Sequence, residues 1–143
     1  MDYPNATWQV GTITLGASGG AESSGTIVPV KCNSMFRSLS LQIYPLETNV
    51  EYEASIYFGG QLFETHSFPD VTGKTIMRAS YPRVLFAPTI GVLTHPNFFI
   101  HGKYDPNKLP ITVYIVNAGT SEATFQVESF YEAFDTYVAT KLN

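Results

Sequence analysis

The sequence is poor in cysteine and in charge, and each shortage excludes a class of protein. Cys32 is the single cysteine, so no intramolecular disulfide can form and no redox compartment is indicated. Charged residues make up 14% of the chain, well below the quarter that is usual in soluble domains. The eight Lys and Arg residues oppose twelve Asp and Glu residues and form no basic arm. We therefore expect no direct binding of nucleic acid through phosphate contacts.

Long apolar segments are also lacking. The first residues, MDYPNATWQV, contain neither a basic segment nor an apolar one, so no signal peptide is predicted. The longest apolar runs are of strand length, which is too short for a transmembrane helix. The sequence thus predicts no membrane span and leaves the localisation open.

Motifs of the common enzyme classes are missing as well. There is no G-x-S-x-G, no P-loop and no G-x-G-x-x-G. His95 and His101 stand six residues apart, which is no standard metal-ligand spacing. Glu53 and His66 are expected to face each other across a hairpin as a surface pair, and Cys32 has no histidine tied to it by sequence. We therefore predict no catalytic residue, no metal ligand, no cofactor and no enzymatic activity.

What the chain does contain is strand-forming sequence, most clearly in residues 51–68, EYEASIYFGGQLFETHSF. Gly59 and Gly60 join two strand-like runs, and a two-residue Gly-Gly link is typical of a type I′ hairpin turn. Such a turn predicts one continuous register, with Ile56 and Phe63 as buried neighbours. The predicted pairs are Phe58–Gln61, Tyr57–Leu62, Ile56–Phe63, Ser55–Glu64, Ala54–Thr65, Glu53–His66 and Tyr52–Ser67.

Further strands are predicted on both sides of this hairpin, from β-branched and aromatic content and from alternation of apolar and polar residues. They cover residues 7–15, 26–32, 36–44, 74–79, 98–101, 111–116 and 123–129, with a weaker signal at 81–88. Residues 16–25, rich in Gly and Ser, predict a flexible loop. Evenly spaced strands without a βαβ unit indicate an all-β protein. We predict an antiparallel β-sandwich of jelly-roll or Greek-key topology, as a single domain over residues 1–143.

The C-terminal tail, residues 131–143, permits two interpretations. Its apolar residues have a spacing that fits one face of a helix, yet Tyr, Phe, Thr and Val favour a strand. We favour a strand that continues to about Phe134, followed by an extended tail. Few charges accompany its aromatic side chains, so the tail is predicted to contact a neighbouring subunit, with Phe134 and Tyr137 as anchors.

Aromatic residues make up 14% of the chain, and aromatic side chains are enriched where protein surfaces meet. Two hypotheses follow. The first is a structural protein that forms homo-oligomers or larger protein assemblies, most simply a virion component such as a capsid, decoration or tail protein. Its interface residues would be Phe130, Tyr131, Phe134, Tyr137 and Val138. The second is a glycan-binding module of the lectin or adhesin type. Its sugar platforms would be Trp8, Tyr81, Tyr104, Asp105 and Asn107.

Overall fold

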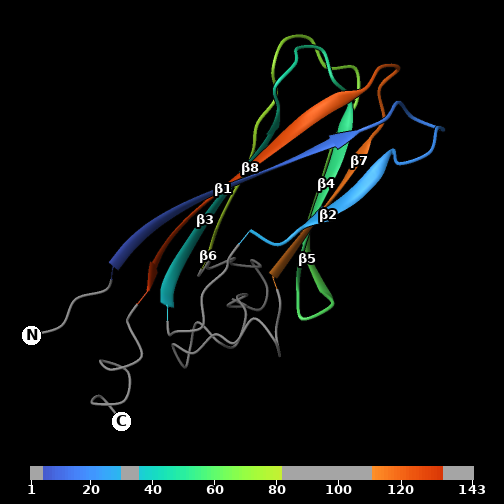
Figure 1. Ribbon diagram of the computed structural model, residues 1–143. Coiled ribbons are helices and arrows are strands. Elements are labelled where there is room, and N and C mark those ends of the chain that lie inside the picture. Colours follow the sequence, from blue (N-terminus) through green and yellow to red (C-terminus); the bar gives the residue numbers. More distant parts are fainter. Residues whose placement is uncertain (1–4, 30–35, 82–110, 134–143) are drawn as a thin grey trace, which may run out of the picture.

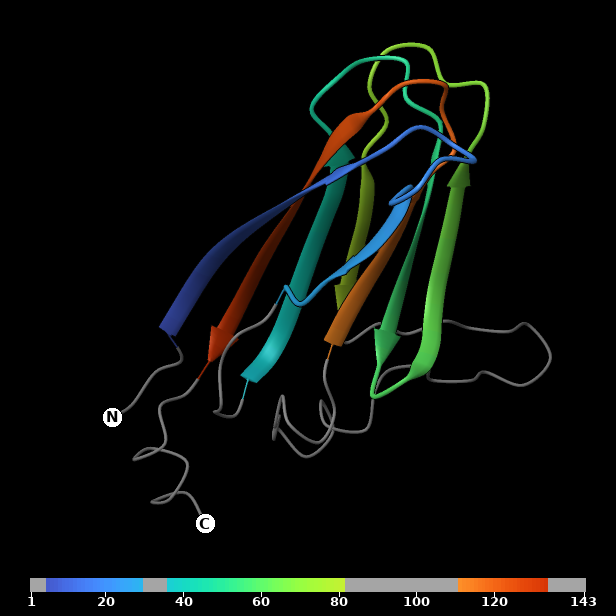
Figure 2. The ribbon, with the colours of Figure 1, turned by 45° about the vertical axis from the view of Figure 1, so that its right-hand side comes forward.

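The computed structural model describes residues 5–29, 36–81 and 111–133, and these residues form two antiparallel four-stranded sheets (Figure 1). We call them sheet A, in the order β1-β8-β3-β6, and sheet B, in the order β2-β7-β4-β5. Figure 2 shows the sheets as two facing layers. The predicted all-β antiparallel sandwich is thereby confirmed. The strands are β1 (Asn5–Leu15), β2 (Ser24–Ile27), β3 (Phe36–Pro45), β4 (Tyr52–Phe58), β5 (Gln61–Phe68), β6 (Met77–Tyr81), β7 (Ile111–Asn117) and β8 (Ala123–Ala133).

The strand pairs are nested along the chain. β4 pairs with β5, β3 with β6, β2 with β7, and β1 with β8, each antiparallel. Two further pairings, β3 with β8 and β4 with β7, join these units into the sheets. The described chain is therefore a long hairpin, with its turn at Gly59-Gly60, that folds over on itself.

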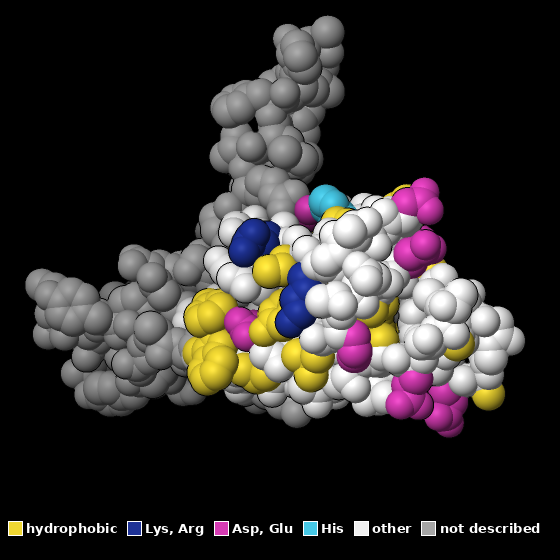
Figure 3. Space-filling view, turned by 90° about the horizontal axis from the view of Figure 1, so that it is seen from above, with side chains coloured by type: hydrophobic (Ala, Val, Ile, Leu, Met, Phe, Trp, Pro, Cys, Tyr) yellow, Lys and Arg dark blue, Asp and Glu magenta, His cyan; other side chains and the backbone are white. Residues whose placement is uncertain are grey.

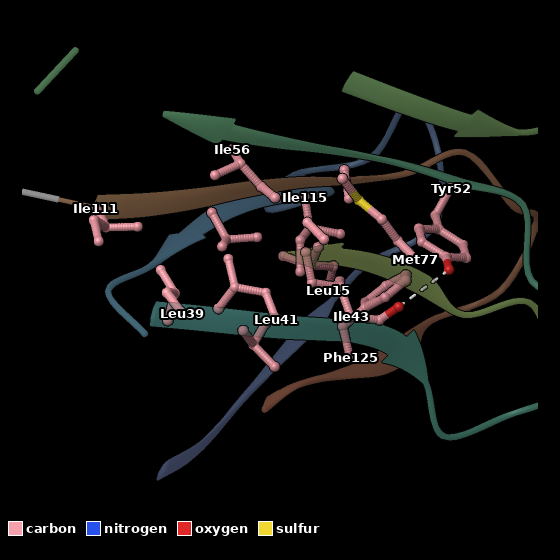
Figure 4. Close-up of a cluster of buried hydrophobic side chains, with 14 of the residues drawn as sticks. Leu15, Leu39, Leu41, Ile43, Tyr52, Ile56, Met77, Ile111, Ile115 and Phe125 are labelled. Atoms are coloured by element: carbon pink, nitrogen blue, oxygen red, sulfur yellow. Dashed lines mark hydrogen bonds between the residues drawn. The ribbon is translucent and has the colours of Figure 1, made fainter. Parts of the chain in front are cut away.

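Alternating apolar residues of both sheets meet in the interior (Figure 4). Strands β4 and β7 show the period-two pattern directly, since Ile56, Ile111 and Ile115 are fully buried. Leu41, Ile43 and Phe125 meet them from sheet A, and all three are at most 1% exposed. Burial of these facing apolar side chains is the main stabilising contribution to the sandwich.

Most predicted strands are present, with shifted ends. The strand predicted at 26–32 corresponds to β2, which ends at Ile27. Pro29 comes two residues later and cannot donate to a strand ladder, which explains why β2 stops there. The predicted loop at 16–25 is two residues too long, since Ser24 and Gly25 belong to β2. The strand predicted at 74–79 is β6, which begins only at Met77. The strand signals at 98–101 and beyond Tyr81 lie outside the described residues. A single domain over all 143 residues stays a prediction.

The predicted hairpin register is correct only beside the turn. Phe58 pairs with Gln61 and Tyr57 with Leu62, but a β-bulge then shifts the register by one residue. The remaining pairs are Ile56–Glu64, Ser55–Thr65, Ala54–His66, Glu53–Ser67 and Tyr52–Phe68. The buried face of β4 is as predicted, whereas the predicted pairs Ile56–Phe63 and Glu53–His66 are wrong.

The bulge has a packing reason. Phe63 meets Phe58 edge to face at 4.9 Å between ring centroids, and Phe68 packs on Tyr52 at 4.8 Å. Phe63 and Phe68 are five residues apart, so they would point to opposite faces of a regular strand. One extra residue in β5 lets both rings pack against the core.

Asn117 fixes the end of the sandwich where β1, β7 and their loops meet. Its side chain is fully buried and donates to the carbonyls of Leu15 (3.2 Å) and Ser121 (2.9 Å). Its Oδ1 accepts from the N–H of Gly119 at 2.9 Å. The buried amide is therefore satisfied on both its nitrogen and its oxygen, as a polar group in a core requires.

Candidate interaction surface

The outer face of sheet A carries the most distinctive arrangement of side chains in the described chain. Register places residues from all four strands in rows across this face. The first row is Trp8–Phe130–Ser40–Ser80, and the second is Val10–Glu128–Gln42–Arg78. The third row is Thr12–Gln126–Tyr44. Strands from both ends of the described chain thus build one surface.

Two aromatic rings lie together at one end of this surface. Trp8 and Phe130 are stacked, with ring centroids 6.3 Å apart and an interplanar angle of 26°. The exposed fraction is 59% for Trp8, 41% for Phe130 and 43% for the neighbouring Val10. Since a residue of this size is normally well covered in a monomer, an exposed aromatic stack beside a valine indicates a contact surface.

A hydrogen-bonded polar group lies beside the aromatic stack. The Tyr44 hydroxyl donates to Oε1 of Glu128 at 2.6 Å, and Nε2 of Gln126 donates to the same carboxylate oxygen at 2.8 Å. Gln126 also donates to the Tyr44 hydroxyl at 2.7 Å. The bond to Glu128, with a smaller effect of desolvation, raises the pKa of Tyr44 above its usual value. The Glu128 carboxylate is thus engaged by two neighbours within its own sheet.

Figure 3 shows the described surface from above, and the hydrophobic side chains gather toward one side, next to basic and acidic groups.

The residues of the interface predicted from sequence do not all lie on one surface. Phe130 is exposed on the outer face, but Tyr131 is 4% exposed and belongs to the core, because successive residues of β8 point to opposite faces. Residues 131–133 are the end of β8, in agreement with the strand predicted to continue to about Phe134. Phe134, Tyr137 and Val138 lie outside the described residues.

The predicted glycan platforms are not brought together in the described residues. Trp8 lies in the row of Phe130 and Ser40, whereas Tyr81 is in register with the buried Leu39. Tyr104, Asp105 and Asn107 lie outside the described residues. Trp8 is the glycan candidate whose side chain the structure describes, and it lies on an open surface.

The titratable groups of the β4–β5 hairpin form local pairs. His66 Nε2 lies 3.2 Å from Oε1 of Glu64, two residues away on β5, and Glu53 accepts from the Ser67 hydroxyl at 3.2 Å. The bulge moves the cross-strand partner of Glu53 from His66 to Ser67, and His66 lies beside Glu64 of its own strand. His95 and His101 lie outside the described residues. Within residues 5–29, 36–81 and 111–133 no group of three metal-ligating side chains occurs, and no helix is long and apolar enough to cross a membrane.

Sequence reasoning missed the Trp8–Phe130 stack. Phe130 lies on the polar side of its strand pattern, and Trp8 is far from it in sequence. Their contact depends on the pairing of β1 with β8, for which no local turn gives a signal.

Comparisons with known proteins give remote likenesses of fold. No family model matches the chain, and no curated protein matches it. Among solved structures, it is similar to a protein of the Bacillus endospore appendages, described as disulfide-linked pili, at 12% identity and a TM-score of 0.46, covering 91% of this chain and 90% of that one. It is also similar to a chain of the cyanophage Pam1 capsid asymmetric unit, at 8% identity and a TM-score of 0.48, covering 92% of this chain and 86% of the other.

A third similar structure is dimeric latent PorU from Porphyromonas gingivalis, at 11% identity and a TM-score of 0.46. The match covers 94% of this chain but only 13% of that much longer one. Likenesses at this level do not indicate a function.

Proposed function

We propose that this chain is a non-enzymatic structural subunit that assembles with copies of itself or packs into a larger protein particle. Within that class, the proposed role is that of a virion component, namely a capsid, decoration or tail protein. The proposed mechanism is burial of the outer face of sheet A against a neighbouring subunit.

The observation that carries the proposal is the exposed stack of Trp8 on Phe130, with Val10 beside it. Aromatic anchors with a neutral surround are the residues that dominate binding energy at protein interfaces. The nearby Glu128 carboxylate already accepts hydrogen bonds within its sheet. A neighbouring subunit that buries it would therefore leave fewer unsatisfied acceptors than it would with an unpaired carboxylate. The low charge of the whole chain also favours association.

The nested strand pairs support the finer proposal. Two four-stranded sheets with pairs β1–β8, β2–β7, β3–β6 and β4–β5 fit a jelly roll, which is the fold of many viral capsid domains. The same fold also occurs in lectins, so this support is an analogy of fold. The topology therefore does not distinguish the two hypotheses.

The mass of the intact protein in solution, measured by sedimentation, tests this proposal. We expect a defined assembly whose stability falls in Trp8→Ser and in Phe130→Ser. The matched control is Tyr114→Ser, which removes an aromatic residue of 37% exposure from the outer face of sheet B. Tyr114→Ser should assemble like the unmodified protein.

The single tryptophan gives a second readout that needs no mutation. Because Trp8 is 59% exposed in the isolated chain, assembly should shift its fluorescence to the blue and protect it from a soluble quencher. A protein that stays monomeric at all concentrations, with Trp8 equally quenched throughout, contradicts self-assembly of this chain and leaves only packing into a particle of other proteins. A monomer whose Trp8 fluorescence responds to glycans would instead support the lectin alternative.

A further inference from the structure

Each sheet of the sandwich has two edge strands, β1 and β6 in sheet A and β2 and β5 in sheet B. An open edge presents unpaired backbone donors and acceptors, which other chains can bind. Natural proteins protect such edges with short strands, proline, bulges or inward-pointing charges. The four edges of this sandwich differ sharply in these protections.

Three of the edges are protected. β5 has a bulge near its turn, and Glu64 lies on the core side of this strand, in register with the buried Ile56. β2 is four residues long and is followed by Pro29. β6 is five residues long and carries the charged Arg78. None of these three edges offers a long, regular, uncharged strand.

β1 has none of these protections. Its sequence, NATWQVGTITL, contains no charged residue and no proline. Its eleven residues pair with β8 without any register shift. Among the edge strands of the described chain, β1 is the longest and the most regular. It pairs with one described strand, β8, on one side only.

Hydrogen bonds at Thr124, near the start of β8, show which backbone groups of β1 point to its open edge. The Thr124 carbonyl accepts from the N–H of Leu46 at 2.8 Å, and the Thr124 N–H donates to Glu47. Leu46 and Glu47 follow β3, so both backbone groups of Thr124 point toward β3. Along an antiparallel strand, the backbone N–H and C=O groups of successive residues point alternately to the two neighbouring strands. The backbone groups of Phe125 and of the other odd-numbered residues of β8 therefore point toward β1.

The same alternation applies to β1. Its odd-numbered residues pair with those odd-numbered residues of β8, as in Ile13–Phe125 and Gly11–Val127. The backbone groups of Trp8, Val10 and Thr12 must therefore point away from β8, toward the open edge. Their side chains lie on the outer face, so the open edge adjoins the aromatic surface.

A groove lies alongside the middle of this edge. Its lining consists of Gln9, Val10, Gly11 and Thr12 of β1 and of the segment Ile27, Val28 and Pro29. Its volume of about 580 Å³ is far larger than the ~30 Å³ that one water molecule occupies in the liquid. Val28 is 41% exposed, and Gln9 and Thr12 also line the groove, so it offers both apolar and polar side chains.

We propose that β1 pairs antiparallel with β1 of a second copy of this chain, about a two-fold axis at Val10, so that sheet A continues across two subunits. This inference rests on the proposed self-assembly and adds to it a contact along the β1 edge, beside the outer face. A copy is the favoured occupant because the edge carries no charge and two copies meet without repulsion. An axis at Val10 is the register that pairs all eleven residues of both strands.

In this pairing Val10 faces Val10 of the copy, and Trp8 faces Thr12. Aromatic and β-branched residues form favourable cross-strand pairs, and the exposed side chains of both copies would cover one another. The contact is isologous, so it closes after two subunits. The opposite edge, β6, is short and charged, which prevents the sheet from growing further.

Substitutions at Val10 test the pairing. Val10→Pro removes an N–H that points to the open edge and leaves the bonds of β1 to β8 in place. Val10→Lys places like charges opposite each other in the dimer, while a monomer can hold Lys beside Glu128. We expect each to weaken the two-subunit contact about tenfold or more in sedimentation. Val10→Thr keeps the branched shape without charge and is the matched control.

Crosslinking tests the register with the fold intact. In a Cys32→Ser background, Val10→Cys should form a disulfide-linked dimer under mild oxidation, because Cα atoms of a hydrogen-bonded antiparallel pair are about 5.5 Å apart, within the disulfide range. Tyr114→Cys, on the other sheet, should not crosslink. This assay also serves if Val10→Pro fails to fold.

The outcomes separate the two proposals. An assembly that resists Val10→Pro and Val10→Lys and gives no Val10→Cys crosslink overturns the β1 contact, and the proposed function stands. An assembly weakened at Val10 without a crosslink also overturns the symmetric pair and indicates another segment as the occupant. An intact protein that is always monomeric overturns both the β1 contact and self-assembly.

Discussion

Tyr52 places a hydroxyl group inside the core, where it is 1% exposed. The hydroxyl donates to the Thr75 carbonyl at 2.6 Å, and a weaker contact of 3.4 Å to the Ile43 carbonyl is drawn in Figure 4. Burial raises the pKa of Tyr52 above its usual value, and a backbone hydrogen bond at Met77 lowers it by less. The neutral hydroxyl is therefore the form that the fold stabilises.

This shift predicts a loss of stability at alkaline pH. The pKa of Tyr52 in the folded protein is raised above the unfolded value of about 10. The neutral hydroxyl therefore contributes its full share to the free energy of unfolding below pH ~10, and this share is lost as pH rises toward the folded pKa. Tyr52→Phe should cost about 1 kcal/mol near neutral pH and give a flatter pH dependence above pH ~10. Chemical denaturation over an alkaline pH series measures both. An equally steep decline in Tyr52→Phe would contradict the assignment.

Gly25 provides a second prediction at this scale. A Cβ at Gly25 would collide with Cδ1 of Ile13 and lie 3.3 Å from Cδ2 of Leu15, so the absence of a side chain lets β2 approach β1. Gly25→Ala should destabilise the protein by about 1 kcal/mol. Ile13→Val removes the colliding methyl group, so the double variant should be more stable than the sum of the single effects by ~0.5 kcal/mol or more. Strict additivity in denaturant melts would refute the collision.

At the scale of elements, the sequence predicted strands well and pairing poorly. Alternation along 36–44 and 123–129 identified β3 and β8 because one face of each strand is buried, and the β-branched content of 111–116 identified β7. The bulge in β5 was not predictable from the turn, since it depends on where Phe63 and Phe68 find partners in the core. The contact of β1 with β8 has no local signal at all, so the outer-face surface emerged only with the tertiary structure.

The bulge itself makes a measurable prediction. With a regular hairpin, Ser67 would face the core and Phe68 would not, whereas the bulge places Phe68 against Tyr52. Phe68→Ala should cost about 2 kcal/mol, less than the ~3–5 kcal/mol of a fully buried phenylalanine because Phe68 is only partly buried. Leu62→Ala, at a residue 51% exposed, should cost less than ~0.5 kcal/mol. Equal costs in denaturant unfolding would favour the regular register.

At the scale of the whole molecule, the strand pairs are nested, so the loop of chain that each pair closes grows from the innermost pair to the outermost. The β4–β5 pair closes a two-residue turn, whereas β1 and β8 come from opposite ends of the described chain. Because loop-closure entropy rises with loop length and long-range contacts slow folding, the inner pairs should form before the outer pair.

Kinetics of a dilute, monomeric sample test this order through two matched substitutions. Ile56→Val, in β4 at the inner hairpin, should mainly slow folding, because its contacts are formed in the transition state. Val127→Ala, in β8 at the outer pair, should mainly speed unfolding. Both residues are at most 1% exposed, so each substitution should destabilise the protein enough for a reliable ratio. If Val127→Ala slows folding in proportion to its loss of stability while Ile56→Val does not, then the strands from the two ends of the chain pair first and the nested order is wrong.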